Sequence, residues 1–75
     1  MTPEQSRMAR AYLKWSLTDL ANASGVGRAT AARFELGESV SERIVAALRS
    51  TLEAAGALLI DRGAYAGGVY PGRAG

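Results

Sequence analysis

The 75-residue chain contains neither cysteine nor histidine, and these two absences remove most of the common routes to catalysis. A chain without cysteine forms no disulfide, has no thiolate nucleophile and binds no metal through sulfur. A chain without histidine lacks the side chain that serves most often as a general base and as a transition-metal ligand. The carboxylates are scattered over expected helix ends and caps, so no acid–base pair or metal cluster can be named. The sequence therefore predicts a protein that is not an enzyme and that uses neither a cofactor nor a metal.

Long apolar runs, a signal-peptide pattern and a large excess of charge are also missing. Without an apolar run of about 20 residues, no segment is expected to cross a membrane, and without a signal pattern we expect a cytoplasmic protein. The net charge is +2 and the pI is about 9.5, so attraction to nucleic acid must come from local clusters of basic residues. With 48% hydrophobic residues, the 75-residue chain suits one small globular domain.

The first segment, 2–14, predicts an amphipathic helix. Thr2 can cap this helix, and Pro3 suits its first position. Apolar residues recur at helical spacing, and this spacing predicts the buried face: Met8, Ala9, Tyr12 and Leu13. Three polar residues are left for solvent: Gln5, Arg7 and Lys14. Trp15, in the short link that follows, is expected to anchor the core.

The stretch 16–37 predicts two short helices around a tight bend. Ser16 and Asp19 form a capping-box pattern at the start of the first helix. Gly25 can adopt the left-handed conformation that ends this helix. Ala21 comes four residues earlier and is small enough to let two steeply crossing helices touch.

The second helix of the pair is expected over 28–36. Its inward residues are Ala31 and Phe34, and Gly37 closes the helix. Helical geometry then turns four residues outward: Arg28, Ala29, Ala32 and Arg33. A helix presented in this way fits the major groove of DNA, where a guanidinium can donate two hydrogen bonds to guanine and a methyl group can contact thymine.

This series of residues resembles the helix-turn-helix regulators of the Cro and lambda-repressor-like type, often called the XRE family. The likeness covers roughly residues 5–56. The matching residues keep the family's register: Trp15-Ser16, Leu20-Ala21, Gly25-Val26, Arg28-Ala29-Thr30, Phe34-Glu35 and Gly37. The resemblance implies an all-α, four-helix lambda-repressor-like bundle with a helix-turn-helix motif at 16–37. To this we add a short C-terminal β-strand or hairpin.

The resemblance also implies which residues contact double-stranded DNA. The positions that match the family's base contacts are Arg28, Ala29 and Arg33. The expected contacts to the DNA backbone are Ser16, Leu17, Thr18, Gly27, Thr30 and Arg43. Two positions depart from the family pattern, because Leu17 stands where a glutamine is frequent and Gly27 where a capping serine is frequent. The usual contact at position 17 is therefore absent or replaced.

Arg10 lies between Ala9 and Leu13, which places it near the motif. In the family that the sequence resembles, an arginine at this place often pairs with the glutamate that matches Glu35. We therefore expect a partly buried Arg10–Glu35 ion pair that fixes the first helix against the second helix of the motif. Two independently solvated charges are the alternative.

A fourth helix is expected over 42–55, capped by Ser41 and ended by Gly56. Its apolar residues recur at helical spacing: Ile44, Val45, Leu48, Leu52 and Ala55. Arg49 is expected to be solvated. This helix closes a DNA-binding domain at 1–56.

The last segment, 57–75, differs in composition and is expected to form a strand, a loop and a tail. The apolar run 57–61 predicts a strand, 62–68 a turn, 69–70 a short second strand and 71–75 a loose tail. A hairpin alone is marginal, so we expect this strand to pair with the same strand of a second copy. The dimerisation residues would be Ala57, Leu58, Leu59, Ile60 and Asp61. The alternative is a strand folded back onto its own helices.

The sequence as a whole predicts a sequence-specific transcriptional regulator, a small homodimeric repressor that covers a promoter through an inverted-repeat operator. No site for a small-molecule ligand is evident. The alternative function is an antitoxin or adaptor that binds a protein partner through its C-terminal segment.

Overall fold

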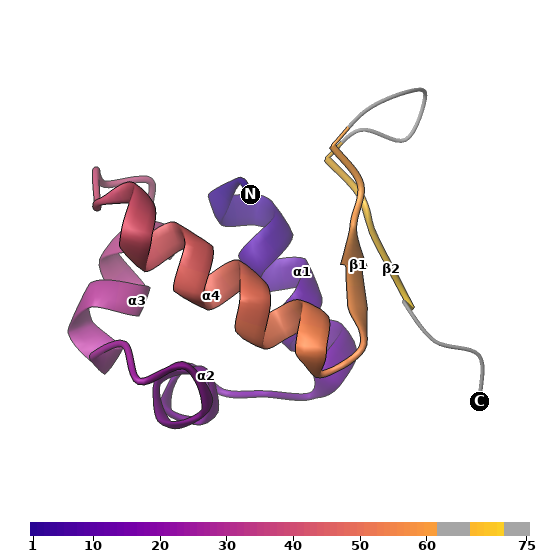
Figure 1. Ribbon diagram of the computed structural model, residues 1–75, viewed down its shortest axis with the longest axis horizontal. Coiled ribbons are helices and arrows are strands. Elements are labelled where there is room, and N and C mark those ends of the chain that lie inside the picture. The colour runs from indigo at the N-terminus through magenta and orange to yellow at the C-terminus, as the bar shows by residue number, and fades with distance from the viewer. Residues whose placement is uncertain (62–66, 72–75) are drawn as a thin grey trace.

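A computed structural model describes residues 1–61 and 67–71, with side chains up to Val69. Four helices and two short strands follow one another in the described residues: α1 (Pro3–Leu13), α2 (Leu17–Ser24), α3 (Arg28–Glu35), α4 (Glu42–Ala54), β1 (Ala57–Leu59) and β2 (Val69–Pro71). The expected turn at 62–68 falls largely outside these residues, and so does the expected tail after Pro71. The helices form one body, and the two strands extend along one end of it (Figure 1).

Helix α1 begins as the sequence predicts, and its buried face is only partly the expected one: Ala9 is buried and Leu13 packs against the core, but Met8 and Tyr12 do not. Thr2 Oγ1 accepts the N–H of Gln5 at 3.1 Å, and Gln5 Oε1 accepts the N–H of Thr2 at 2.9 Å, which completes a capping box. The residues that the helix buries are Gln5, Ser6 and Ala9. Met8 and Tyr12, which the apolar spacing assigned to the core, are 41% and 48% exposed. That prediction was wrong, because two polar side chains of α1 have buried partners elsewhere in the chain.

One apolar core joins the helices to the hairpin. Its buried members come from every helix, from the bend between α2 and α3 and from β1: Ala9, Leu20, Val26, Ala31, Phe34, Leu48, Leu52, Ala57 and Leu59. Trp15 packs half-buried against this cluster, in the anchoring place that the sequence indicated. Since Ala57 and Leu59 are 2% and 4% exposed, the hairpin shares the core of the helices.

Helix α4 supplies the centre of that core with Leu48 and Leu52, both fully buried. Ser41 Oγ accepts the N–H of Ile44 at 3.3 Å and caps the start of the helix. Near the other end, Arg49 donates to Glu53 at 3.3 Å and to Asp61 at 2.6 Å. The expectation that Arg49 is simply solvated was therefore wrong: its guanidinium links α4 to the end of the first strand.

The two strands pair antiparallel within the chain. The register places Ala57 opposite Pro71, Leu58 opposite Tyr70 and Leu59 opposite Val69. Ala57 and Leu59 point into the core of their own chain, whereas Leu58 is 46% exposed. This arrangement matches the alternative in which the apolar strand folds back onto its own helices. Pairing of this strand with a second copy would have to use the edge of β1 that β2 does not occupy.

The buried amide of Gln5 holds the hairpin on α1. Its Nε2 donates to the backbone oxygens of Ile60 at 3.0 Å and Gly68 at 3.3 Å. With Oε1 engaged at the helix cap, the whole amide group has partners, as a buried polar group requires. Gln5 is 1% exposed, so the expectation that it faces solvent was wrong.

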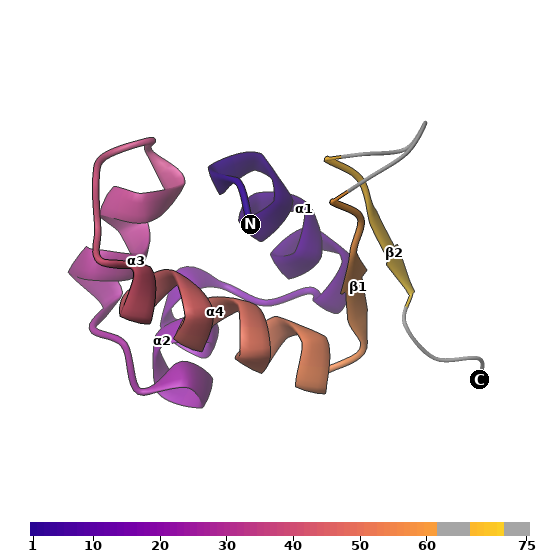
Figure 2. The ribbon, with the colours of Figure 1, turned by 45° about the horizontal axis from the view of Figure 1, so that its top comes forward.

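The hairpin and α3 lie at opposite ends of the longest axis of the molecule, as Figures 1 and 2 both show. That axis measures 30 Å. Any partner on the outward side of α3 is therefore well separated from a partner on the hairpin. In the part of the chain that the structure describes, no helix is both long and apolar enough to traverse a bilayer.

Candidate nucleic-acid interface

A three-residue bend connects α2 to α3 and sets the angle between them. The bend begins at Gly25, which adopts a left-handed φ of 75° and donates its N–H to Ala21 O at 3.0 Å. Ser24 Oγ then accepts the N–H of Val26 at 3.2 Å, and the Val26 side chain is buried. A positive φ is adopted by glycine at little steric cost, so the chain can turn here without strain.

Helix α3 is fixed by its inner face and presents its outer face to solvent. Ala31, Phe34 and Glu35 are buried. The three residues expected to contact bases are all exposed: Arg28, Ala29 and Arg33. The guanidinium groups of Arg28 and Arg33 make no hydrogen bond or ion pair with any other described residue. The outward face of α3 therefore offers two unpaired cations on a rigid helix.

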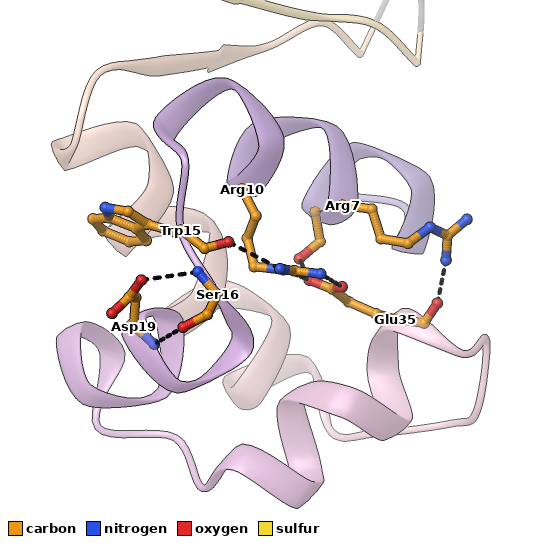
Figure 3. A network of polar contacts seen from close by, with 7 residues as sticks. Arg7, Arg10, Trp15, Ser16, Asp19 and Glu35 are labelled. Atoms are coloured by element: carbon orange, nitrogen blue, oxygen red, sulfur yellow. Dashed lines mark hydrogen bonds and ion pairs between the residues drawn. The ribbon is translucent and has the colours of Figure 1, made fainter.

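The start of α2 carries three of the expected backbone contacts, and its cap is already occupied. Ser16 Oγ accepts the N–H of Asp19 at 3.0 Å, and Asp19 Oδ2 accepts the N–H of Ser16 at 2.9 Å (Figure 3). Ser16 and Thr18 are exposed, and Leu17 is half-buried. Because the Asp19 carboxylate already lies at this helix end, a phosphate would have to use the N–H groups of Leu17 and Thr18.

The remaining expected backbone contacts flank α3. Gly27 caps α3 without a side-chain hydrogen bond, and a Cβ built on it meets only Thr30 Oγ1 at 4.0 Å. The backbone at Gly27 is thus open to close approach. Thr30 is half-buried, and Arg43 is exposed in the first turn of α4 next to Glu42. Among the described residues, Arg43 has no side-chain partner.

The expected Arg10–Glu35 ion pair is present and is bidentate. Arg10 Nη2 lies 2.7 Å from Glu35 Oε1, and Arg10 Nε lies 2.8 Å from Glu35 Oε2 (Figure 3). The side chains of Arg10 and Glu35 are 19% and 5% exposed. The hydrogen bond to Glu35 raises the pKa of the Arg10 guanidinium above its ordinary value. This pair joins the last turn of α1 to the last turn of α3.

Three further groups complete the network around Glu35, and the sequence did not indicate them. Ser6 Oγ donates to Glu35 Oε2 at 2.7 Å, and Arg10 Nη1 donates to Trp15 O at 3.0 Å. Arg7, which was expected to face solvent alone, donates through Nη1 to the backbone oxygen of Glu35. Ser6 and Arg10 share a face of α1 because they are four residues apart. That spacing was the available signal, but a serine on a helix has too many ordinary roles to single it out.

The network sets the position of α3 without using its outer face. Among the described residues, the side chains that donate to Glu35 are Ser6, Arg7 and Arg10, all of them on α1 (Figure 3). The described residues contain no group of three or more acidic side chains that could hold a metal ion. The chemistry available at the outward face is therefore hydrogen-bond donation, positive charge and apolar contact.

The chain was compared with protein-family models and with curated proteins, and it matches none of them.

Proposed function

We propose that this protein is a helix-turn-helix regulator that binds double-stranded DNA sequence-specifically, with α2 and α3 as the motif and α3 as the helix that enters the major groove. It would act in the cytoplasm as a small homodimeric repressor that occludes a promoter. The observation that carries this proposal is the outward face of α3. There Arg28 and Arg33 are exposed and have no hydrogen-bond or ion-pair partner among the described residues, while the Glu35 network fixes the inner face.

The charge on this face supports a polyanionic partner. Over 28–36 the only acidic residue is Glu35, which is buried and paired with Arg10, so no carboxylate of α3 faces outward. A guanidinium in the major groove can donate to both O6 and N7 of guanine. A ligand without negative charge would leave the two cations without compensation. Duplex DNA supplies both the phosphates and the guanine acceptors.

The homodimer is proposed because one module of this size contacts few base pairs, and useful specificity needs two half-sites about one helical turn apart. Its interface is proposed at the hairpin, at the end of the molecule away from α3. There the exposed Leu58 and the edge of β1 that does not pair with β2 are the proposed contacts of a partner. Sedimentation at micromolar concentration tests this, and a stable monomer would remove the dimer from the proposal.

The DNA-binding proposal is tested by selecting duplexes from a random-sequence library and measuring their affinity as a function of salt. We expect one sequence family to be enriched and its binding to weaken steeply with salt, because each neutralised phosphate releases counterions. Arg33→Ala should weaken the selected site by about 1–3 kcal/mol and relax the preference at one position. Arg43→Ala should weaken all sequences alike and reduce the salt slope by about 1.

Arg49→Ala is the matched control, because it removes one arginine whose partners are Glu53 and Asp61 near the hairpin. It should leave the affinity and the preferred sequence almost unchanged. Failure to enrich any sequence, or equal effects of the changes at Arg33 and Arg49, would overturn the proposed function.

A further inference from the structure

The most exposed large apolar side chain in the described part of the chain is Leu36, which caps the end of α3. It is 77% exposed, compared with 46% for Leu58. Its N–H donates to Ala32 O at 3.0 Å, and its φ and ψ are −85° and −1°. Leu36 therefore continues the helical path of α3, and its side chain projects at the angle that the helix dictates.

That angle places Leu36 in the middle of the face proposed to meet DNA. At 3.6 residues per turn, Arg28 and Arg33 are about 140° apart around the axis, and Leu36 falls about halfway between them. Ala29 and Ala32 point in nearly the same direction, about 20° and about 40° from Leu36. The outward face thus has an apolar centre, dominated by Leu36, between two unpaired guanidinium groups.

The same face lacks the side chains that usually read adenine. Residues 28–36 contain no asparagine and no glutamine, whose amides can bond both N6 and N7 of adenine. The other major-groove feature that marks an A·T pair is the 5-methyl group of thymine, which apolar side chains contact. On this helix an A·T pair is therefore best read through its methyl group.

We infer that Leu36 is a specificity-determining residue that contacts thymine methyl groups in the major groove, beside guanines bound by Arg28 and Arg33. This inference rests on the proposed DNA-binding function and goes beyond it by naming the feature that is read. Arg28 and Leu36 are about 12 Å apart along the helix axis. With a rise of about 3.4 Å per base pair, the methyl group lies about three to four base pairs from the guanine that Arg28 contacts.

The test uses the full chain and the duplex selected from the random library. Each thymine in turn is replaced by deoxyuridine, which keeps the base pairing and removes only the methyl group. For the natural protein, we expect one position per half-site at which the replacement raises Kd about fourfold, the effect of about one buried methyl group. Leu36→Ala changes both half-sites of the proposed dimer, so it should raise Kd for the thymine duplex by about that factor for each half-site and should abolish the difference between thymine and uracil at that position.

Met8→Ala is the matched control, because it truncates another exposed apolar side chain, 41% exposed, on α1 and outside both α3 and the hairpin. It should preserve both Kd and the thymine preference. Since Leu36 is exposed, the change to alanine should leave the melting temperature almost unchanged, which separates a lost contact from lost folding.

Two results overturn the inference and leave the proposed function intact. One is specific binding in which no thymine can be replaced by deoxyuridine with any effect. The other is a Leu36→Ala protein that keeps the full sensitivity to uracil at every position. A chain that enriches no DNA sequence at all would instead overturn the proposed function itself.

Discussion

Replacement of Glu35 by alanine should destabilise this protein more than almost any other single change of a charged residue. Glu35 is 4% exposed, and its carboxylate accepts from Arg10 Nε, Arg10 Nη2 and Ser6 Oγ. Without this carboxylate, Arg10 keeps only its bond to Trp15 O, and the fully buried Ser6 hydroxyl loses its acceptor. Breaking a buried pair by removing one partner costs about 3–5 kcal/mol.

That loss is large beside the whole stability of the chain. At about 0.05–0.15 kcal/mol per residue, a domain of 75 residues has a free energy of unfolding of about 4–11 kcal/mol. The Glu35→Ala protein should therefore be partly unfolded at room temperature if the natural protein lies at the low end of this range. The assay is urea unfolding followed by far-UV circular dichroism, with linear extrapolation to water.

Two controls separate the buried pair from an ordinary loss of charge. Glu35→Gln keeps the size of the side chain and one acceptor oxygen, so it should be less destabilising than Glu35→Ala. Arg49→Ala breaks two ion pairs, to Glu53 and Asp61, whose side chains are 31%, 39% and 46% exposed in the order Arg49, Glu53 and Asp61, and it should change stability by less than about 1 kcal/mol. A loss below about 0.5 kcal/mol for Glu35→Ala would refute the reasoning, because the network would then contribute nothing to the position of α3.

Two other changes have definite expected outcomes. Gly25→Ala should lower the free energy of unfolding by about 1 kcal/mol or more in the same urea assay, because φ is 75° at Gly25. Gly27→Ala should be close to neutral, because φ is −59° at Gly27 and the added methyl group would lie 4.0 Å from its nearest neighbour, Thr30 Oγ1. Equal effects at the two glycines would contradict the assigned bend. Stability should be nearly flat from about pH 6 to about pH 9, because the chain has no histidine. The pKa of Arg10 is raised by its hydrogen bond to Glu35, so the stability that the Arg10 charge contributes is present across the neutral range and is lost only above the ordinary titration range of arginine. A mid-range transition in a pH series of thermal melts would contradict this.

Much of the secondary structure could be predicted from local signals in the sequence. Ser16 with Asp19, Thr2 with Pro3, and Ser41 each start a helix where the sequence predicts one, because a helix start depends on a few neighbouring hydrogen bonds. Gly25 ends α2 with the positive φ that was expected. Such features depend on contacts within one turn of chain, so the sequence alone carries them.

The Arg10–Glu35 pair could be predicted only through the family resemblance, since the two residues are 25 positions apart. The four-residue spacing of Ser6 and Arg10 is too common on helices to mark Ser6 as a partner of Glu35, and no signal marked Arg7. The whole candidate DNA-contact surface likewise depended on the prediction that Ala31 and Phe34 point inward, and the structure buries both.

What the sequence by itself determined is where each helix starts and stops and which face of α3 stays outside. What only the tertiary structure decided is how α1 and the C-terminal hairpin use their polar and apolar groups. Apolar spacing predicted Met8 and Tyr12 inside and Gln5 outside, yet Gln5 is buried, and its amide finds acceptors in the carbonyls of Ile60 and Gly68 on the hairpin. Hydrogen-bond partners more than 50 residues away leave no periodic signal on a helix, so only the folded arrangement of the chain shows them.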